Sequence, residues 1–413
     1  MDRVYFQCFL SFLLFIVVIY FPGLLFFAFF QEGFEAYFNY NGDLYLSSFI
    51  LLSSFAILVF FSFFIVDKMP DFNFNHLNFK FVFYLFCFLV IIYFLLSVYF
   101  FINFTSSFRH TNRLANAGPL VTLLFSMKPL LYFFVSLVLI YTLNGNELGV
   151  KSKFMIFLLL VSSILSLNSS MQFVFIIVLS IIIWMPKLLR LKISEINLKT
   201  IILVLLFVPL IFCSVVFIGI GNKVGYSYLL SEQGVEYLLG LGDLLFPRMS
   251  TSLFSSVIVF NNFNDGILFG DSVLHGINTT LSNRFALLTG DLSFDSSVIN
   301  TVNRLNYLEV FTNHAERAGA SPGIISSIFY TPLFPLSFFV IPFYVALIFS
   351  SLRFHMVNEI EFGFISKLVL PYLLLSLFES PLNVFYLFDP ITILFFSVVF
   401  FGRFISIQRV FEN

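Results

Sequence analysis

The chain has 413 residues, of which 60% are hydrophobic and 10% are charged, and its formal net charge is −1. Soluble globular chains are about 45–50% apolar, so this composition excludes an ordinary water-soluble domain. The balanced charge, with a pI of about 6.5, gives no sign of the basic surface that nucleic-acid binding requires. Apolar runs of roughly 20 residues recur, and each is long enough to cross a bilayer as a helix. The sequence therefore predicts an all-α polytopic membrane protein.

In chain order, about ten apolar segments are predicted to be transmembrane helices. They cover approximately residues 5–30, 44–66, 81–104, 119–143, 153–168, 171–186, 200–220, 323–352, 364–385 and 390–404. The first segment is too long for the core of a signal peptide, and we expect it to remain as a span. The fifth and sixth segments are short, and the polar turn Asn168-Ser169-Ser170 joins them.

The positions of lysine and arginine predict the orientation. If the N-terminus is cytoplasmic, most of the 21 Lys and Arg residues lie in inside segments, and the short outside loops hold only Arg109 and Arg113. Cytoplasmic loops of membrane proteins carry this kind of excess. We therefore expect both termini to be cytoplasmic and the long connection 221–322 to lie outside.

The connection 221–322 covers roughly 100 residues, and structureless loops of that length are rare unless they are functional. Within it, residues 228–246 and 302–311 carry apolar side chains at three- and four-residue spacing, which predicts amphipathic helices. Such helices lie at the membrane surface or fold back onto the bundle. We expect a lid over an outward cavity, with residues 1–413 as a single membrane-embedded domain.

Several enzyme motifs are absent from the sequence. It has no G-x-x-x-x-G-K-[ST] phosphate loop, so we do not expect ATP hydrolysis. It has no H-E-x-x-H, C-x-x-C or D-x-D motif, and Cys8, Cys87 and Cys213 lie far apart, so we expect neither a metal nor another cofactor. Without a D-x-D motif, the sequence does not support a nucleotide sugar held by a metal ion as the donor. A glycosyltransferase whose active site faces outward would then need a lipid-linked donor.

The connection gathers residues that suit pyrophosphate chemistry. Arginine stays charged and binds phosphate through two parallel hydrogen bonds, and a His or carboxylate takes a proton from an acceptor hydroxyl. Arg248, in DLLFPRMSTSLF (243–254), follows a proline among apolar residues. It is either a ligand for phosphate or sugar, or an interfacial arginine with its aliphatic stem in lipid. Arg284 and Arg304 are further candidates for substrate binding.

The segment NHAERAGASPG (313–323) closes the connection. His314 and Arg317 share a face if the preceding helix continues through them, and small residues follow that allow a backbone to approach a ligand closely. Pro322 can begin the next helix, whose N-terminal amides favour anions. The segment is therefore either a phosphate site or a polar helix end capped by a turn.

Two other groups of cations come before the connection. Arg109, His110 and Arg113 form an outside basic patch that would meet pyrophosphate or anionic lipid head groups. Lys128, followed by Pro129, either kinks or shortens the fourth span, or contacts the substrate.

The segment TNHAERAGASPGIISSIFY (312–330) resembles the end of the large periplasmic loop of Wzy-type polymerases, which extend O-antigen and related bacterial surface polysaccharides. The start of that loop is similar to DLLFPRMS, with Asp243 and Arg248, and the arrangement of spans agrees along nearly the whole chain. The resemblance implies a GT-C-like bundle in the bacterial inner membrane with its active site toward the periplasm.

The same resemblance implies a reaction and its participants. The growing chain on undecaprenyl pyrophosphate is the donor, a new lipid-linked repeat unit is the acceptor, and no metal takes part. Arg248, His314 and Arg317 would bind or protonate the pyrophosphate or activate the acceptor, with Glu309 and Glu316 as reserve candidates for the base. The resemblance also implies a chain-length regulator protein and membrane lipid as partners.

The sequence departs from the family pattern at the turn after the fifth span. Relatives often carry an arginine there, whereas this chain has LNSSMQF (167–173), without a cation. Arg109, Arg113 and Lys128 are the candidates to compensate.

Two alternative functions stay open. An O-antigen ligase has a similar bundle and outside loop but transfers the whole chain to the lipid A core. A lipid-repeat flippase would need two related bundles around a charged cavity, usually with short loops.

Overall fold

A computed structural model describes the protein at residues 38, 44–66, 79–104, 148–167, 170–186, 213–222, 225–264 and 302–311, and at single positions within 20–29, 120–138 and 202–210. In these residues the chain is almost entirely α-helical, apart from one isolated bridge between Phe38 and Phe311. The chain divides into two compact units, each made from several separate segments. They are described in turn.

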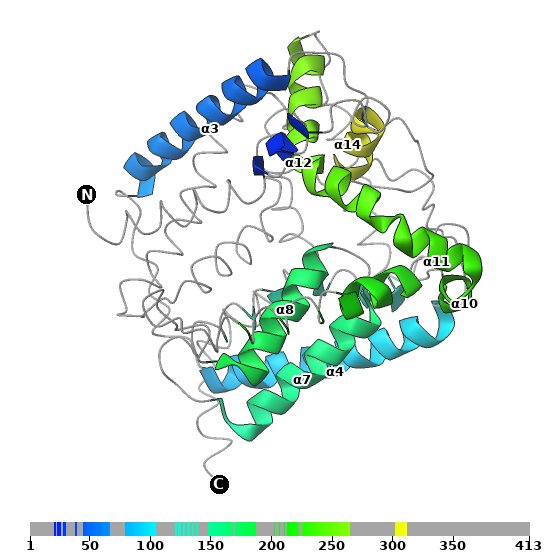
Figure 1. Cartoon of the computed structure of the whole chain (residues 1–413). Coiled ribbons are helices and arrows are strands. Elements are labelled where there is room, and N and C mark those ends of the chain that lie inside the picture. Colours follow the sequence, from blue (N-terminus) through cyan, green and yellow to red (C-terminus); the bar gives the residue numbers. More distant parts are fainter. Residues whose placement is uncertain are drawn as a thin grey trace, which may run out of the picture. The chain divides into compact units, whose positions relative to one another are not determined.

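Unit 2 contains the helices of segment 73–238. Its elements are α4 (Phe79–Phe104), α7 (Val150–Leu165), α8 (Ser170–Trp184), α10 (Tyr226–Leu229) and α11 (Glu232–Leu239), with further helical residues in 120–138 and 213–222. Helix α7 packs against both α4 and α8 (Figure 1). This packing makes α7 the centre of the described part of unit 2.

Helix α4 is apolar on its exposed face as well as on its buried face. The buried face repeats at three- and four-residue spacing and consists of Phe86, Val90, Tyr93, Ser97 and Phe100. The exposed face follows the same period with Tyr84, Phe88, Ile91, Leu95 and Ile102. A helix at the surface of a soluble protein carries polar side chains on its outer face. The exposed face of α4 is therefore suited to an apolar surrounding.

One helix in the described part of the chain, Phe83–Asn103, is long and apolar enough to cross a membrane. Its mean hydropathy is 2.8, and only 33% of its most apolar window is buried, whereas the core helix of a soluble protein is mostly buried. Four shorter apolar helical stretches accompany it: Leu44–Ser53, Phe175–Trp184, Cys213–Asn222 and Leu253–Asn262.

Unit 1 is built around a helix from the long connection. It contains α3 (Leu44–Val66), α12 (Leu241–Asn264) and α14 (Val302–Val310), and α12 packs against both of the others (Figure 1). The Ser47 hydroxyl donates a hydrogen bond of 3.1 Å to Oδ1 of Asn261, which joins α3 to α12.

The central part of α12 is buried on all sides. Every residue from 253 to 259 is buried, and a run of this length covers the whole circumference of the helix. Gly23 lies so close to α12 that a Cβ atom added there would come 3.0 Å from the Leu253 side chain. Over this length α12 belongs to the core of unit 1.

The predicted elements and the observed helices can be compared directly. The predicted segment 44–66 coincides with α3, and the predicted helix at 302–311 is confirmed as α14. The predicted helix at 228–246 is wrong as a continuous element, because the chain breaks at Leu230–Ser231 and again at Gly240. The last three predicted spans, from 323 onward, lie outside the described residues.

Replacing Gly234 by alanine is expected to destabilise unit 2. A Cβ atom at Gly234 would overlap the carbonyl oxygen of Tyr228, and two backbone atoms of Leu229 lie 2.7 Å away. Backbone cannot move aside as a flexible side chain can, so the expected loss is about 1–3 kcal/mol. Thermal unfolding of the protein in detergent measures the change. Gly149→Ala is the matched control, because nothing lies within 4 Å of its added Cβ; equal melting temperatures for the two variants would contradict this packing.

Candidate functional site

A buried lysine marks the most unusual polar site in the described part of unit 2. Lys128 is 9% exposed, and its Nζ donates a hydrogen bond of 2.8 Å to Oε1 of Gln172. Gln172 belongs to the first turn of α8 and is fully buried. An ionised side chain among apolar helices is costly to bury, so it is rare and is a candidate for a functional residue.

The Gln172 amide continues the network into α7. Its Nε2 donates to the Ser163 carbonyl oxygen at 2.7 Å and to the Ser166 hydroxyl at 2.9 Å. Tyr93 of α4 lies with its hydroxyl 2.9 Å from the same Ser166 oxygen. Because the Ser166 hydroxyl already donates its proton to the Ser162 carbonyl, Tyr93 is the donor in this pair. Lys128, Gln172, Ser166 and Tyr93 are called the lysine cluster below.

The end of α7 is held by a side chain from another helical segment. Asn222 Nδ2 donates to the carbonyl oxygens of Leu165 and Leu167 at 3.2 and 3.3 Å. Carbonyls at a helix C-terminus lack partners within the helix, so this amide satisfies them. The Tyr226 hydroxyl donates in turn to Asn222 Oδ1 at 2.9 Å. The start of the polar turn after α7 is therefore fixed beside the lysine cluster.

Two further buried hydroxyls lie beside the cluster; they meet no partner with full hydrogen-bond geometry among the described residues, but both interact with the Tyr93 hydroxyl. They belong to Ser97, one turn after Tyr93 on α4, and to Ser163 of α7. Both side chains are completely buried. Ser97 and Ser163 therefore extend the polar surroundings of Tyr93.

The hydrogen bonds of the lysine cluster and of Asn222 connect five helical segments. Tyr93, Lys128, Ser166 and Gln172 come from the predicted third to sixth spans in that order, and Asn222 lies two residues after the end of the predicted seventh span. If successive spans run in opposite directions, most of these positions lie toward the same end of the bundle. The contacts join the five segments at that end.

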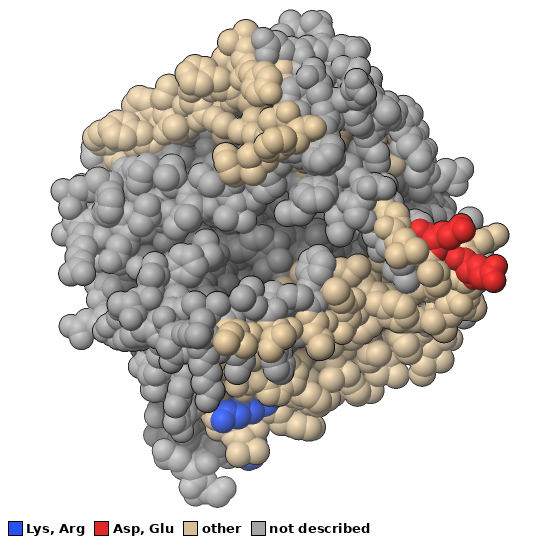
Figure 2. Space-filling view, in the orientation of Figure 1, with Lys and Arg blue, Asp and Glu red and all other residues tan. Residues whose placement is uncertain are grey.

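Charged side chains lie at opposite ends of unit 2. Lys151 and Lys153 are exposed at the start of α7, and Glu232 and Glu236 are exposed on α11 (Figure 2). The 16 residues of α7 rise by roughly 24 Å, so its two ends are well separated. Asn222 contacts the C-terminal end of α7, and α11 follows Asn222 shortly afterwards in the chain, so the acidic residues belong to the end opposite the lysines. The basic end is the one predicted to face the cytoplasm, so the lysine cluster is nearer the end predicted to face outward.

A second polar group joins α12 to α14 in unit 1. The Ser255 hydroxyl donates a hydrogen bond of 2.6 Å to Oδ1 of the buried Asn306. Asn262 Nδ2 donates at 2.8 Å to Oε2 of Glu309, which is half-buried. These two bonds fix the register of the helices and hold a carboxylate at the edge of their contact.

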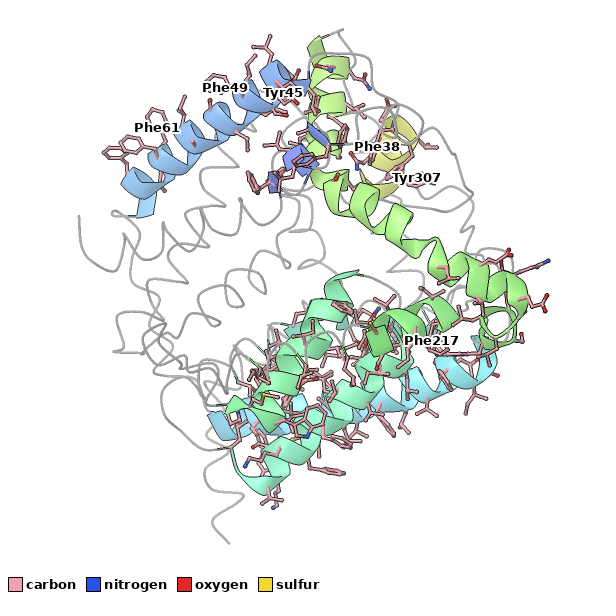
Figure 3. All side chains as sticks on the ribbon, viewed as in Figure 1. Phe38, Tyr45, Phe49, Phe61, Phe217 and Tyr307 are labelled. Carbon is pink, nitrogen blue, oxygen red and sulfur yellow. The ribbon has the colours of Figure 1, made fainter. Side chains whose placement is uncertain are left out.

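Aromatic rings hold the end of α14 in place. Phe38 stacks on Phe254 of α12, with ring centroids 4.5 Å apart, and its ring lies 5.4 Å from that of Phe311. Tyr307 in turn stacks on Phe311 at 4.7 Å. Figure 3 shows Phe38 and Tyr307 together beside α12 and α14. The chain therefore leaves α14 from a fixed point just before residue 312.

The predicted site residues fall partly within the described structure. Arg248 lies on α12 and Arg304 on α14, although their side chains are outside the described part. The other predicted residues lie outside the described residues: His314, Arg317, Arg284, Arg109 and Arg113. The sequence interpretation did not identify the pairing of Lys128 with Gln172. The available signal was Lys128 within the apolar segment 119–143, together with the polar turn 168–170 that precedes Gln172.

Replacing Tyr93 by phenylalanine is expected to destabilise unit 2 by about 1–3 kcal/mol, because Ser166 loses a buried donor. Tyr84→Phe on the exposed face of the same helix is the control and is expected to cost under about 0.5 kcal/mol. Thermal unfolding in detergent compares them, and equal stability of the two variants would contradict the assigned hydrogen bond.

No group of three or more His, Cys, Asp or Glu residues able to hold a metal ion occurs among the residues that the structure describes. Among these residues, unit 2 holds a buried lysine that donates a hydrogen bond to the Gln172 amide oxygen, and unit 1 separately holds a carboxylate that accepts a hydrogen bond from the Asn262 amide. Comparison of the chain with family models, curated proteins and solved structures found no match.

Proposed function

We propose that the protein is a glycosyltransferase of the bacterial inner membrane that polymerises undecaprenyl-pyrophosphate-linked oligosaccharide repeat units into O-antigen or a related surface polysaccharide. The observation that carries the proposal is Lys128, a buried cation held by Gln172 inside a bundle of apolar helices. A reaction on a lipid-linked pyrophosphate needs positive charge at the membrane, where the substrate lies.

The membrane location is part of the proposal. It is supported by the exposed apolar face of α4 and by a similar face on α3, where Phe49, Phe60 and Phe64 are exposed. Together with the apolar segments of the sequence, these faces favour about ten spans with both termini in the cytoplasm. The bundle would then be GT-C-like, with the active site toward the periplasm.

The buried Lys128 also supplies a cation beside the turn 167–173, where the sequence itself has none. The turn LNSSMQF (167–173) carries no cation of its own, yet Gln172 accepts a hydrogen bond from Lys128 of a different segment. A cation at this turn is the feature that Wzy-type polymerases often have. Lys128 therefore takes the place of the missing arginine and interacts with a lipid-linked phosphate group as a point charge.

The chemistry follows from the proposed substrates. The bond between the donor sugar and the pyrophosphate oxygen breaks as the acceptor hydroxyl attacks, and negative charge develops on the departing pyrophosphate. Arg248, Arg317 and His314 neutralise or protonate that pyrophosphate, and Arg284, Arg304, Arg109 and Arg113 contribute to binding the lipid-linked sugars. The chain's own cations thereby do the work that a metal ion does elsewhere, and we expect no cofactor requirement.

Deletion of the gene tests the proposal in cells. Surface polysaccharide on a gel is expected to show a single repeat unit attached, with the ladder of longer chains lost. Re-expression of the wild-type gene restores the ladder. Complete loss of attached repeats would instead favour the ligase or the flippase, and an unchanged ladder would contradict all three functions.

A further inference from the structure

We propose that Glu309 is the general base that takes the proton from the acceptor hydroxyl, and that Asn262 is the residue that positions it. This inference rests on the proposed glycosyl transfer and assigns one step of it. The sequence left this role open between histidine and several carboxylates.

The geometry of Glu309 suits a base. Asn262 Nδ2 donates to Oε2 of Glu309 at 2.8 Å, which restricts the rotation of the carboxylate. The side chain is half-buried, so it is shielded by protein while part of it stays accessible. A base must be able to come within hydrogen-bond reach of the proton that it removes, and an accessible carboxylate with a fixed orientation meets this condition.

Other acids with described side chains in the long connection lack these features. Glu232 and Glu236 are both exposed on α11. An exposed carboxylate in water is solvated and keeps its rotamer freedom. Of these three acids, Glu309 alone combines partial burial with a described hydrogen bond from a second helix.

The helices around Glu309 form a rigid support. The bond from Ser255 to Asn306 lies one turn before Glu309 on α14 and locks that helix to α12. Stacking of Tyr307 on Phe311 fixes the other side of the same turn. Sites built on packed helices hold catalytic groups more precisely than loops do. Residues 312–317, with His314 and Arg317, continue directly from this support.

The assigned step balances in atoms and charge. The acceptor hydroxyl oxygen forms a bond to the anomeric carbon of the donor sugar, and its proton passes to the Glu309 carboxylate. The bond between that carbon and the pyrophosphate oxygen breaks, and its electron pair leaves with the pyrophosphate. The protonated Glu309 then releases its proton to water, which restores the base.

Glu309→Gln is the direct test, measured on the purified full chain with lipid-linked repeat units. Glutamine has nearly the same shape, and its side-chain oxygen can still accept the bond from Asn262, but it cannot take the proton. Turnover is expected to fall by about 10²–10⁴-fold with little change in KM. Glu232→Gln and Glu236→Gln are matched controls on exposed acids and are expected to retain wild-type turnover.

Asn262→Leu gives a readout that a purely structural role would not produce. Without the amide donor the carboxylate is no longer oriented, so kcat is expected to fall while KM stays close to the wild-type value, a split that a loss of folded protein would not give. If the wild-type protein forms polymer and Glu309→Gln matches its turnover, this inference is wrong while the proposed function stands. If the wild-type protein forms none, the proposed function itself fails.

Discussion

Replacing Lys128 by methionine is expected to reduce polymer formation by about 10²–10³-fold, the range typical for loss of one charged or oriented donor from an active site. Methionine is unbranched and flexible, so it fills the buried space that the lysine stem occupies. The substitution removes the ammonium group that contacts Gln172, and with it the positive charge of the lysine cluster. Chain-length ladders and rates of repeat addition in membranes measure the effect.

The controls for this substitution separate charge from packing. Lys128→Arg keeps a cation at the site and is expected to retain more activity than the methionine variant, although the guanidinium fits Gln172 differently. Lys153→Met removes an exposed cation from α7 and is expected to leave the ladder unchanged. A normal ladder for Lys128→Met at normal protein abundance would contradict the proposed role of the lysine cluster.

Replacing Arg248 by alanine is expected to have an effect of the same size, about 10²–10³-fold on repeat addition. Arg248 lies on α12 two residues before the buried Ser250, so its backbone position is fixed by a helix that packs on α3 and α14. Arg248→Lys restores the charge without the bidentate geometry, so we expect partial recovery of activity.

A substitution of His314 tests the segment 312–317, which follows α14 in the sequence. His314→Ala is expected to lower the rate of repeat addition, because the histidine binds or protonates the pyrophosphate in the proposed reaction. Ladders of normal length for both Arg248→Ala and His314→Ala, at normal protein levels, would show that neither residue belongs to the site.

The helices were the part of the fold that sequence could predict. Long apolar runs without glycine or proline, such as 44–66, leave few alternatives to a helix, and α3 has these same bounds. The break in 228–246 was harder to predict, because apolar periodicity continues across it. Ser231, followed by Glu232, was the available signal for the start of α11. Ser231 is the N-cap of that helix, and its hydroxyl accepts a hydrogen bond of 3.3 Å from the Gly234 amide.

The partners within the site could not be predicted, for a physical reason. Lys128 and Gln172 are 44 residues apart, and Asn262 and Glu309 are 47 apart. Which side chains meet depends on how the helices are rotated and shifted against one another, and neither is encoded in local periodicity. Composition indicated which residue types suit pyrophosphate chemistry, whereas only the packed helices identify the amide that holds each charged group.

The central claim is that this chain by itself joins lipid-linked repeat units. The most direct measurement incubates the purified protein, in detergent or liposomes, with undecaprenyl-pyrophosphate-linked repeat units and a metal chelator, and follows the lipid-linked products by mass spectrometry. We predict products longer by whole repeat units, with one undecaprenyl pyrophosphate released for each bond formed. Unchanged single repeat units from folded protein would contradict the proposed function.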